Sequence, residues 1–131
     1  MDRIKLLIVD DEIVVQQSCV AIFSEKSNCY DITTVSSGEE ALKILEGKSF
    51  DIILTDIKMP GLPGLDLLST ISNKYPDTAV IVITGYATVK TAVEAMKLGA
   101  VDFIPKPFTP DEIYNAVEKV ASRFRQRNRN M

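Results

Sequence analysis

Short runs of apolar, β-favouring residues alternate along this chain with segments whose apolar residues recur at helical spacing. The runs cover residues 5–9, 30–35, 51–55, 79–84 and 101–105. Such alternation is typical of an α/β domain, in which crossover helices connect the strands of a parallel sheet. The first, third and fourth runs are almost continuously apolar, as in strands that are buried on both faces. The second run alternates with polar residues, so we expect it at an edge of the sheet.

The segments between and after these runs carry helical stripes, and capping residues support them. The stripes are Val15, Cys19, Ile22 and Phe23; Leu42 and Leu45; Leu67, Leu68 and Ile71; Val89, Ala92, Val93 and Met96; and Ile113, Val117, Val120 and Phe124. Ser37 and Thr109 each precede a glutamate by three positions, as in a capping box. Gly47 and Gly99 stand where helix-ending glycines belong. We therefore expect a doubly wound, five-stranded parallel sheet with five helices on its two faces.

Length and charge limit the kind of protein this can be. With 131 residues, the chain has about the size of one domain. We place this domain at residues 1–122, followed by a basic tail or the start of a linker at residues 123–131. The net charge of −3 and the pI of about 5.0 argue against a general nucleic-acid or membrane-surface binder. Arginines in the tail complement the dipole of a helix C-terminus, so we expect no direct nucleic-acid binding.

Histidine is absent from the sequence, and the two cysteines, Cys19 and Cys29, lack the spacing of metal ligands. We interpret both cysteines as reduced core residues of a cytoplasmic protein. No apolar stretch has the length of a signal peptide's apolar region or of a bilayer span. The absence of histidine excludes the Ser-His and Cys-His nucleophile arrangements. Any chemistry must therefore use carboxylates, lysine, hydroxyl groups and a metal ion.

Polar residues follow four of the five expected strands at the point where each strand ends. They are Asp10 and Asp11 after the first run, Asp56 after the third, Thr84 at the end of the fourth and Lys106 after the fifth. In a doubly wound sheet, functional residues lie at the carboxyl ends of the strands, next to the point where the strand order reverses. We therefore expect all five residues on one rim.

Clustered carboxylates on this rim would repel one another by about 1–4 kcal/mol per close pair without compensation. A hard dication such as Mg²⁺ provides that compensation, because it prefers oxygen ligands and is held by one or two carboxylates plus a phosphate. We expect Asp11 and Asp56 to be direct ligands and Asp10 to act through water. Lys106 adds a positive charge for an anion, and Thr84 adds a hydroxyl donor. Asp56 is then a nucleophile for a phosphoryl group.

Four stretches resemble the receiver domains of bacterial two-component response regulators, in order and at the spacing of that family. They are "LLIVDDE", "DIILTDIKMPGLPGLDLL", "VIVITGYA" and "AVDFIPKPF", and the resemblance covers almost the whole chain. It implies a flavodoxin-like strand order of 2-1-3-4-5. It also implies that Asp56 is the phosphoacceptor and that Asp10 and Asp11 form the acidic pair for Mg²⁺. The backbone carbonyl of Lys58 would complete the protein ligands of the metal.

The same resemblance assigns roles to residues at the ends of the fourth and fifth runs. Thr84 would be the switch hydroxyl and Phe103 the switch aromatic residue. Lys106 would contact the phosphoryl group. The peptide bond between Lys106 and Pro107 would be cis, which is uncommon even before proline.

The implied function is that of a phosphorylation-activated signalling switch in a two-component phosphorelay. A sensor histidine kinase or phosphotransfer protein would donate the phosphoryl group, and the domain would catalyse only its own phosphorylation and dephosphorylation. A homodimer formed on phosphorylation would use the stripes of residues 89–96 and 113–124 and the strand of residues 101–105. "TGYATVKTAVEAMKLGAVDFIPKPF" further resembles receivers attached to enhancer-dependent transcriptional activators. We expect either a stand-alone receiver or the receiver portion of a longer protein, since the chain contains no effector domain.

Two other classes place related residues at strand ends. A phosphatase of the haloacid-dehalogenase type also uses an aspartate nucleophile, Mg²⁺ and a lysine, but it needs a second aspartate two positions after the first, where this chain has Lys58. A flavodoxin-like FMN binder needs a phosphate-cradling loop after the first strand, where "DDE" would repel phosphate. Both classes fit the sequence less well than a receiver.

Overall fold

The computed structural model describes residues 3–26, 29–58, 61–85 and 87–129. Strands and helices alternate along these residues. In order they are β1 (Ile4–Val9), α1 (Ile13–Lys26), β2 (Tyr30–Val35), α2 (Gly38–Leu45), β3 (Ile52–Thr55), α3 (Gly64–Lys74), β4 (Ala79–Thr84), α4 (Val89–Lys97), β5 (Asp102–Pro105) and α5 (Pro110–Arg129). Each strand begins within one residue of the run predicted for it, and ends with that run.

The strands form one parallel sheet in the order β2-β1-β3-β4-β5. The chain moves from β1 to β2 on one side and then returns to place β3, β4 and β5 on the other side. The strand order therefore reverses at β1, as predicted for a doubly wound sheet. β2 lies at an edge, and most of its residues are only partly buried or exposed, which confirms the interpretation of its alternating pattern.

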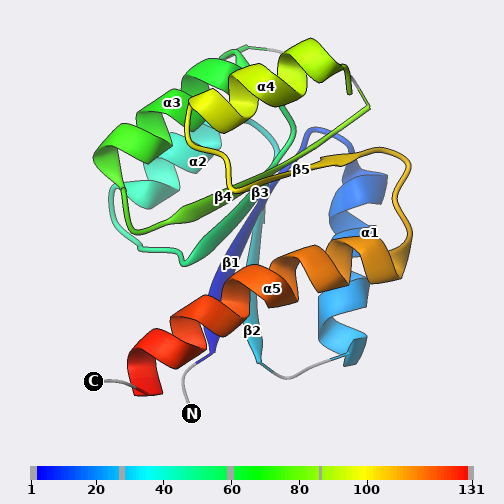
Figure 1. Ribbon diagram of the computed structural model, residues 1–131, viewed down its shortest axis with the longest axis vertical. Coiled ribbons are helices and arrows are strands. Elements are labelled where there is room, and N and C mark those ends of the chain that lie inside the picture. The colour runs from blue at the N-terminus through cyan, green and yellow to red at the C-terminus, as the bar shows by residue number, and fades with distance from the viewer. Residues whose placement is uncertain (1–2, 27–28, 59–60, 86, 130–131) are drawn as a thin grey trace.

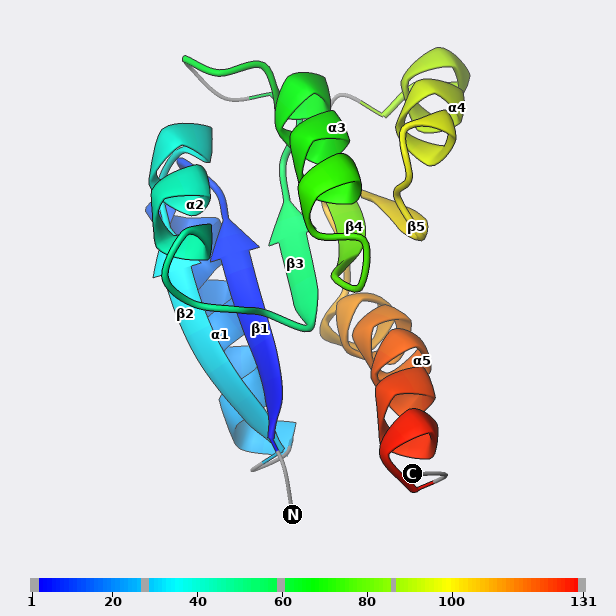
Figure 2. The same cartoon turned by 90° about the vertical axis from the view of Figure 1, so that its left-hand side faces the viewer.

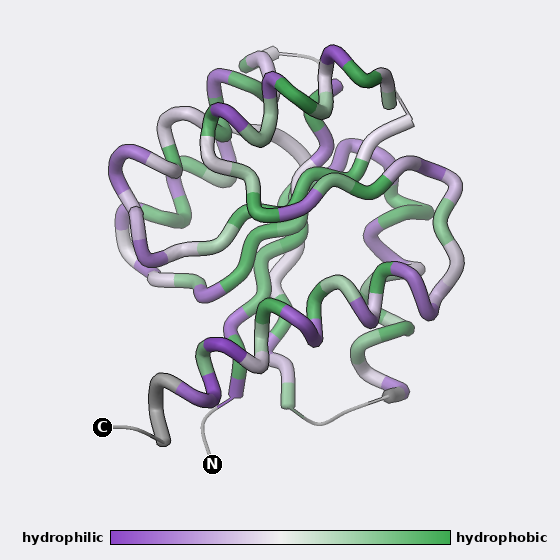
Figure 3. The backbone as a smooth tube through the Cα atoms, viewed as in Figure 1, coloured by the Kyte–Doolittle hydropathy of each residue, from purple (hydrophilic) through white to green (hydrophobic). Residues whose placement is uncertain are grey.

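Helices cover both faces of the sheet. α1 and α5 lie on one face, and α2, α3 and α4 lie on the other (Figures 1 and 2). Successive residues of β1 point to opposite faces: Leu6 and Ile8 pack with residues of α1 and α5, whereas Leu7 and Val9 pack with residues of α2 and α3. Figure 3 shows the resulting apolar strands between helices along which hydrophobic and hydrophilic residues alternate. β1 is thus buried on both faces, as its continuous apolar run predicts.

Reciprocal hydrogen bonds cap several helices. The Thr109 hydroxyl accepts from the Glu112 N–H at 3.2 Å, and the Glu112 carboxylate accepts from the Thr109 N–H at 2.9 Å. Ser37 caps α2 by accepting from the Glu40 N–H, but the Glu40 carboxylate accepts from the Ser36 N–H, so the capping box predicted at Ser37 is not a reciprocal pair. Thr88 forms a further capping box with Thr91 at the start of α4, which the sequence reasoning missed because a threonine takes the place of the usual glutamate.

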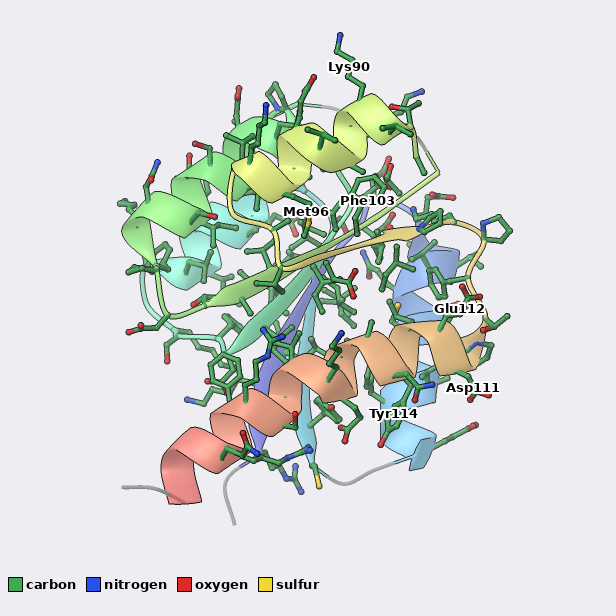
Figure 4. All side chains as sticks on the ribbon, viewed as in Figure 1. Lys90, Met96, Phe103, Asp111, Glu112 and Tyr114 are labelled. Atoms are coloured by element: carbon green, nitrogen blue, oxygen red, sulfur yellow. The ribbon has the colours of Figure 1, made fainter. Side chains whose placement is uncertain are left out.

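Helix α5 continues past residue 122 as far as Arg129. Arg125 forms an ion pair with Glu118 at 3.1 Å, and Glu118 also accepts a hydrogen bond from the Tyr30 hydroxyl of β2. On the same helix, Tyr114 packs against Phe23 of α1 with a ring-centroid distance of 5.8 Å (Figure 4). These contacts fasten α5 to α1 and to the edge strand.

Cys19 is buried in the core and Cys29 is half-buried. Burial raises the pKa of the Cys19 thiol to about 12. Both cysteines contribute to the core cluster on the face of α1 and α5, which agrees with their interpretation as core residues; their reduced state stays a prediction. Among the helices described, none combines the length and the apolar character needed to cross a membrane.

The turn between β3 and α3 depends on a close backbone approach at Gly64. Its N–H donates to the Ile57 carbonyl at 3.2 Å. A Cβ at position 64 would lie 2.1 Å from the Ile57 Cα and 2.5 Å from the Ile57 carbonyl oxygen. Only glycine allows this approach, which shapes the segment directly after Asp56.

We expect Gly64→Ala to lower the free energy of unfolding by about 1–3 kcal/mol, because the backbone at Ile57 must move to admit the methyl group. Gly47→Ala is the matched control, since a Cβ there meets nothing within 4 Å. It should change the stability by less than about 1 kcal/mol. Urea denaturation followed by circular dichroism measures both values. Equal effects of the two substitutions would contradict the role assigned to Gly64.

Candidate functional site

The backbone of the sheet brings three predicted site residues to one rim. The Asp10 N–H donates to the carbonyl of the last residue of β2 at 3.2 Å, and the Asp56 N–H donates to the last carbonyl of β1 at 3.1 Å. The Lys106 N–H donates to the last carbonyl of β4 at 2.9 Å. Each residue thus extends the parallel hydrogen-bonding pattern by one position beyond its own strand. Their side chains start from neighbouring points at the carboxyl end of the sheet.

The ammonium group of Lys106 lies at the centre of this rim. Its Nζ donates to Asp56 Oδ2 at 2.7 Å, to Asp10 Oδ2 at 2.8 Å and to Glu12 Oε1 at 3.0 Å. An ammonium has three N–H donors, so these three carboxylates use all of them. The side chains of Asp10 and Asp56 are 0% and 6% exposed, whereas that of Glu12 is 60% exposed. Two of the acceptors are therefore buried and the third lies at the solvent edge.

The other oxygen of each buried carboxylate is held by the backbone. Asp10 Oδ1 accepts from the Glu12 N–H at 2.9 Å, and Asp56 Oδ1 accepts from the Lys58 N–H at 2.9 Å. In both cases the donor lies two residues further along the chain. Each carboxylate is consequently fixed at one oxygen by its own loop and at the other by Lys106.

Burial sets the electrostatics of this group. Burial raises the pKa of Asp10, and the hydrogen bond from Lys106 partly offsets that rise. Burial alone would lower the pKa of Lys106, but its hydrogen bonds to Asp10, Asp56 and Glu12 together outweigh burial and raise it. Lys106 therefore stays positively charged. The repulsion expected between clustered carboxylates is compensated by this internal cation.

Carboxylate oxygens of Asp10, Glu12 and Asp56 lie within 4.8 Å of one another, which makes them a possible metal-binding group among the described residues. Sequence reasoning named Asp10 and Asp56 but missed Glu12, although it directly follows the acidic pair in "DDE". Asp11 has an exposed side chain and lies outside this group. The metal-binding roles of Asp10, Asp11 and Asp56 stay predictions, as does that of the Lys58 carbonyl.

The predicted switch residues lie on neighbouring strands. Thr84 is fully buried at the end of β4. Phe103 pairs with Val82 of β4 and packs into the core on the face that α2, α3 and α4 cover, below α4 (Figure 4). The Lys106–Pro107 peptide bond is cis, which confirms the expectation drawn from the family resemblance.

Gln16 of α1 is a further residue of the rim that sequence reasoning missed. Its side-chain amide donates to the Asp10 carbonyl at 2.6 Å, and it also contacts the Val35 carbonyl at 3.3 Å and the Ser36 hydroxyl at 3.2 Å. These contacts tie the first helix to the ends of β1 and β2. No sequence motif signals them, because they depend on where a helix side chain meets two loop carbonyls.

The arrangement suits two chemical tasks. Its donors are carboxylate oxygens, which are the hard ligands that Mg²⁺ prefers, so the residues present fit that ion. Asp56 places a buried carboxylate directly after a strand, in contact with a cationic side chain. Together these features are those of a site that holds a dication and an anionic group.

Comparison with known proteins agrees with this geometry. The Response regulator receiver domain family matches residues 6–118. The DNA-binding transcriptional regulator NtrC of Escherichia coli K12 is 40% identical over 94 residues, which are 72% of this chain and 20% of NtrC. The response regulator protein PilR of Pseudomonas aeruginosa is 36% identical over 128 residues, which are 98% of this chain and 28% of PilR.

This chain therefore spans only 20% of the length of NtrC and 28% of the length of PilR. Among solved structures, a response regulator receiver domain protein from Clostridium thermocellum superposes with a TM-score of 0.84 at 34% identity. That superposition covers 94% of this chain and 98% of the other. The chain belongs to the response regulator receiver domain family.

Proposed function

We propose that this receiver accepts a phosphoryl group on Asp56 and converts it into a change of shape. The observation that carries this proposal is the contact of the buried Asp56 carboxylate with Lys106 at 2.7 Å, beside a second buried acid. In the transfer, an Asp56 oxygen forms a bond to phosphorus while the bond from phosphorus to the donor breaks. The Lys106 ammonium and the Lys58 N–H donate to Asp56, and we propose that both would donate to oxygens of the incoming group.

Mg²⁺ is the cofactor of this proposal. When bound, it would neutralise charge on the phosphoryl oxygens during transfer. We propose Asp11, Asp56 and the Lys58 carbonyl as direct ligands and Asp10 as a ligand through water. The acidic character of the rim and its oxygen donors support this assignment.

We propose a sensor histidine kinase or phosphotransfer protein as the phosphoryl donor, and the cytoplasm as the compartment, where free thiols persist. The domain acts on no other substrate and catalyses only its own phosphorylation and dephosphorylation. We keep residues 1–122 as the receiver and residues 123–131 as a basic tail or the start of a linker. The similarity to NtrC and PilR supports membership of a longer transcriptional regulator.

We further propose a homodimer, formed on phosphorylation, through α4, β5 and α5. Large apolar side chains are exposed on α4 and just before β5, with Val89 83%, Met96 48% and Val101 39% exposed. Figure 4 places Met96 on the side of α4 nearest to β5. Burial of such a patch in a dimer removes apolar surface from water.

Thr84 and Phe103 provide the switch in this proposal. The Thr84 hydroxyl turns toward a phosphoryl oxygen on Asp56, and Phe103 rotates into the space that Thr84 vacates. A hydrogen bond to a charged group is worth roughly 1.5–3 kcal/mol, which shifts a two-state equilibrium by about ten- to a hundredfold. Phe103 of β5 lies opposite Val82, two positions before Thr84 on β4, so both side chains start from the same face of the sheet, which supports the coupling.

Asp56→Asn is expected to abolish phosphorylation by acetyl phosphate, because the amide is a poor nucleophile. Intact-mass spectrometry should show one added phosphoryl group on the unmodified chain in Mg²⁺ and none on the variant. Asp66→Asn, at an exposed site on α3, is the charge-matched control and should still be labelled. Labelling that persists in Asp56→Asn would place the acceptor elsewhere.

Asp11→Asn is expected to remove most of the rise in melting temperature that saturating Mg²⁺ gives the unmodified chain, because it removes a direct ligand. In chelator the same variant should differ from the unmodified chain by less than about 0.5 kcal/mol, since Asp11 is exposed and Lys106 compensates the buried pair. Asp31→Asn is the control, because Asp31 is exposed at the start of β2, at the end of the strand away from Asp10. A full Mg²⁺ response in Asp11→Asn would exclude Asp11 from the ligands.

Thr84→Ala is expected to accept phosphate still but to lose most of the NMR shift changes that beryllofluoride induces at residues 87–99 and 101–104. Beryllofluoride stands in for the phosphoryl group on Asp56. Thr84→Ser keeps the hydroxyl and should retain those changes. Undiminished changes in Thr84→Ala would show that the signal leaves by another route.

A further inference from the structure

Lys106 contacts three carboxylates that differ in position. Asp10 and Asp56 lie in the interior at the ends of β1 and β3, whereas Glu12 belongs to the loop before α1 and has a 60% exposed side chain. The distances from Nζ to the three are similar, at 2.8, 2.7 and 3.0 Å. The ammonium is thus shared between two buried carboxylates and one carboxylate at the solvent edge of the site.

A dication in the proposed site competes with this ammonium. It would draw on the same carboxylates, Asp10 and Asp56, that now hold Nζ, and two cations repel each other at such short range. The ammonium must then move away from the interior pair. Glu12 is the one of its three present acceptors that the proposed set of metal ligands does not use.

We propose that Glu12 is the positioning residue that receives the Lys106 ammonium when Mg²⁺ enters. Glu12 then holds the ammonium at the solvent edge of the site until a phosphoryl group arrives on Asp56. This inference rests on the proposed function of the site. Glu12 lowers the free-energy cost of displacing Lys106 from Asp10 and Asp56, because the ammonium keeps one acceptor that it already contacts. It also leaves the lysine beside the place where the phosphoryl oxygens will lie.

The local structure of Glu12 fits this role. Its N–H donates to Asp10 Oδ1 at 2.9 Å, and its carbonyl accepts from the N–H groups of Val15 and Gln16 at 3.1 and 3.2 Å. The backbone of Glu12 is therefore fixed between the acidic loop and the first turn of α1. Its exposed side chain retains the freedom to follow the ammonium, while its starting point does not move.

A double-mutant cycle separates this role from a simple contribution of negative charge. The dissociation constant for Mg²⁺ is measured by titrating magnesium chloride into ¹⁵N-labelled protein and following amide shifts. The four chains are the unmodified protein, Glu12→Gln, Lys106→Met and the double variant. Coupling between the two positions appears as a departure from additivity.

Glu12→Gln is expected to weaken Mg²⁺ binding roughly three- to fivefold when Lys106 is present, which is the scale of a partly exposed ion pair. In the Lys106→Met chain the same substitution should weaken binding by less than about 1.5-fold, because no ammonium needs an acceptor and the remaining charge effect is screened by salt. Glu25→Gln removes a negative charge from an exposed site near the other end of α1 and should have no effect in either chain.

Equal losses in both chains would overturn the inference and show that Glu12 acts on the ion directly. An unchanged dissociation constant for Mg²⁺ in the single variant Glu12→Gln would also overturn it, because the displaced Lys106 would then not need Glu12 as its acceptor. In both outcomes the unmodified chain still binds Mg²⁺, so the proposed function stands. If the unmodified chain binds no Mg²⁺, the metal site of the proposed function fails, and this inference fails with it.

Discussion

The contact of one lysine ammonium with two buried carboxylates is the interaction on which the rim of this domain depends. Asp10 and Asp56 are buried carboxylic acid side chains, and buried carboxylates are costly unless they are paired. Lys106 provides that pairing from a third strand end. The pair of acids and the lysine therefore hold the ends of β1, β3 and β5 in one arrangement, which the metal ion and the phosphoryl group that we propose would disturb.

The parallel sheet determines which residues take part. Each of the three residues comes directly after a strand, and each continues the hydrogen bonding of the neighbouring strand by one position. The strand and helix periodicity, and the rule that functional residues lie at the carboxyl ends of parallel strands, were therefore sufficient to predict Asp10, Asp56 and Lys106 as neighbours. The strand order and the cis peptide before Pro107 came from the family resemblance, and the structure confirmed both.

Other features of the site depend on side-chain directions that no spacing encodes. Glu12 and Asp11 are adjacent in sequence and chemically similar, but only Glu12 contacts Lys106 among the contacts described. Gln16 reaches Asp10 because α1 begins at Ile13 and turns its amide toward the ends of two strands. The sequence also did not predict that Lys106 neutralises the repulsion between Asp10 and Asp56, because we expected that lysine to contact an incoming anion.

The distance along the chain between the members of the rim has a consequence for biosynthesis. Lys106 lies 96 residues after Asp10 and 50 residues after Asp56, so the acids leave the ribosome long before their cation does. A nascent receiver that has completed β4 but not β5 has both acids and lacks their charge partner. The three charged side chains are consequently brought together only when the chain beyond β5 docks, so an unfinished chain holds both acids without their cation.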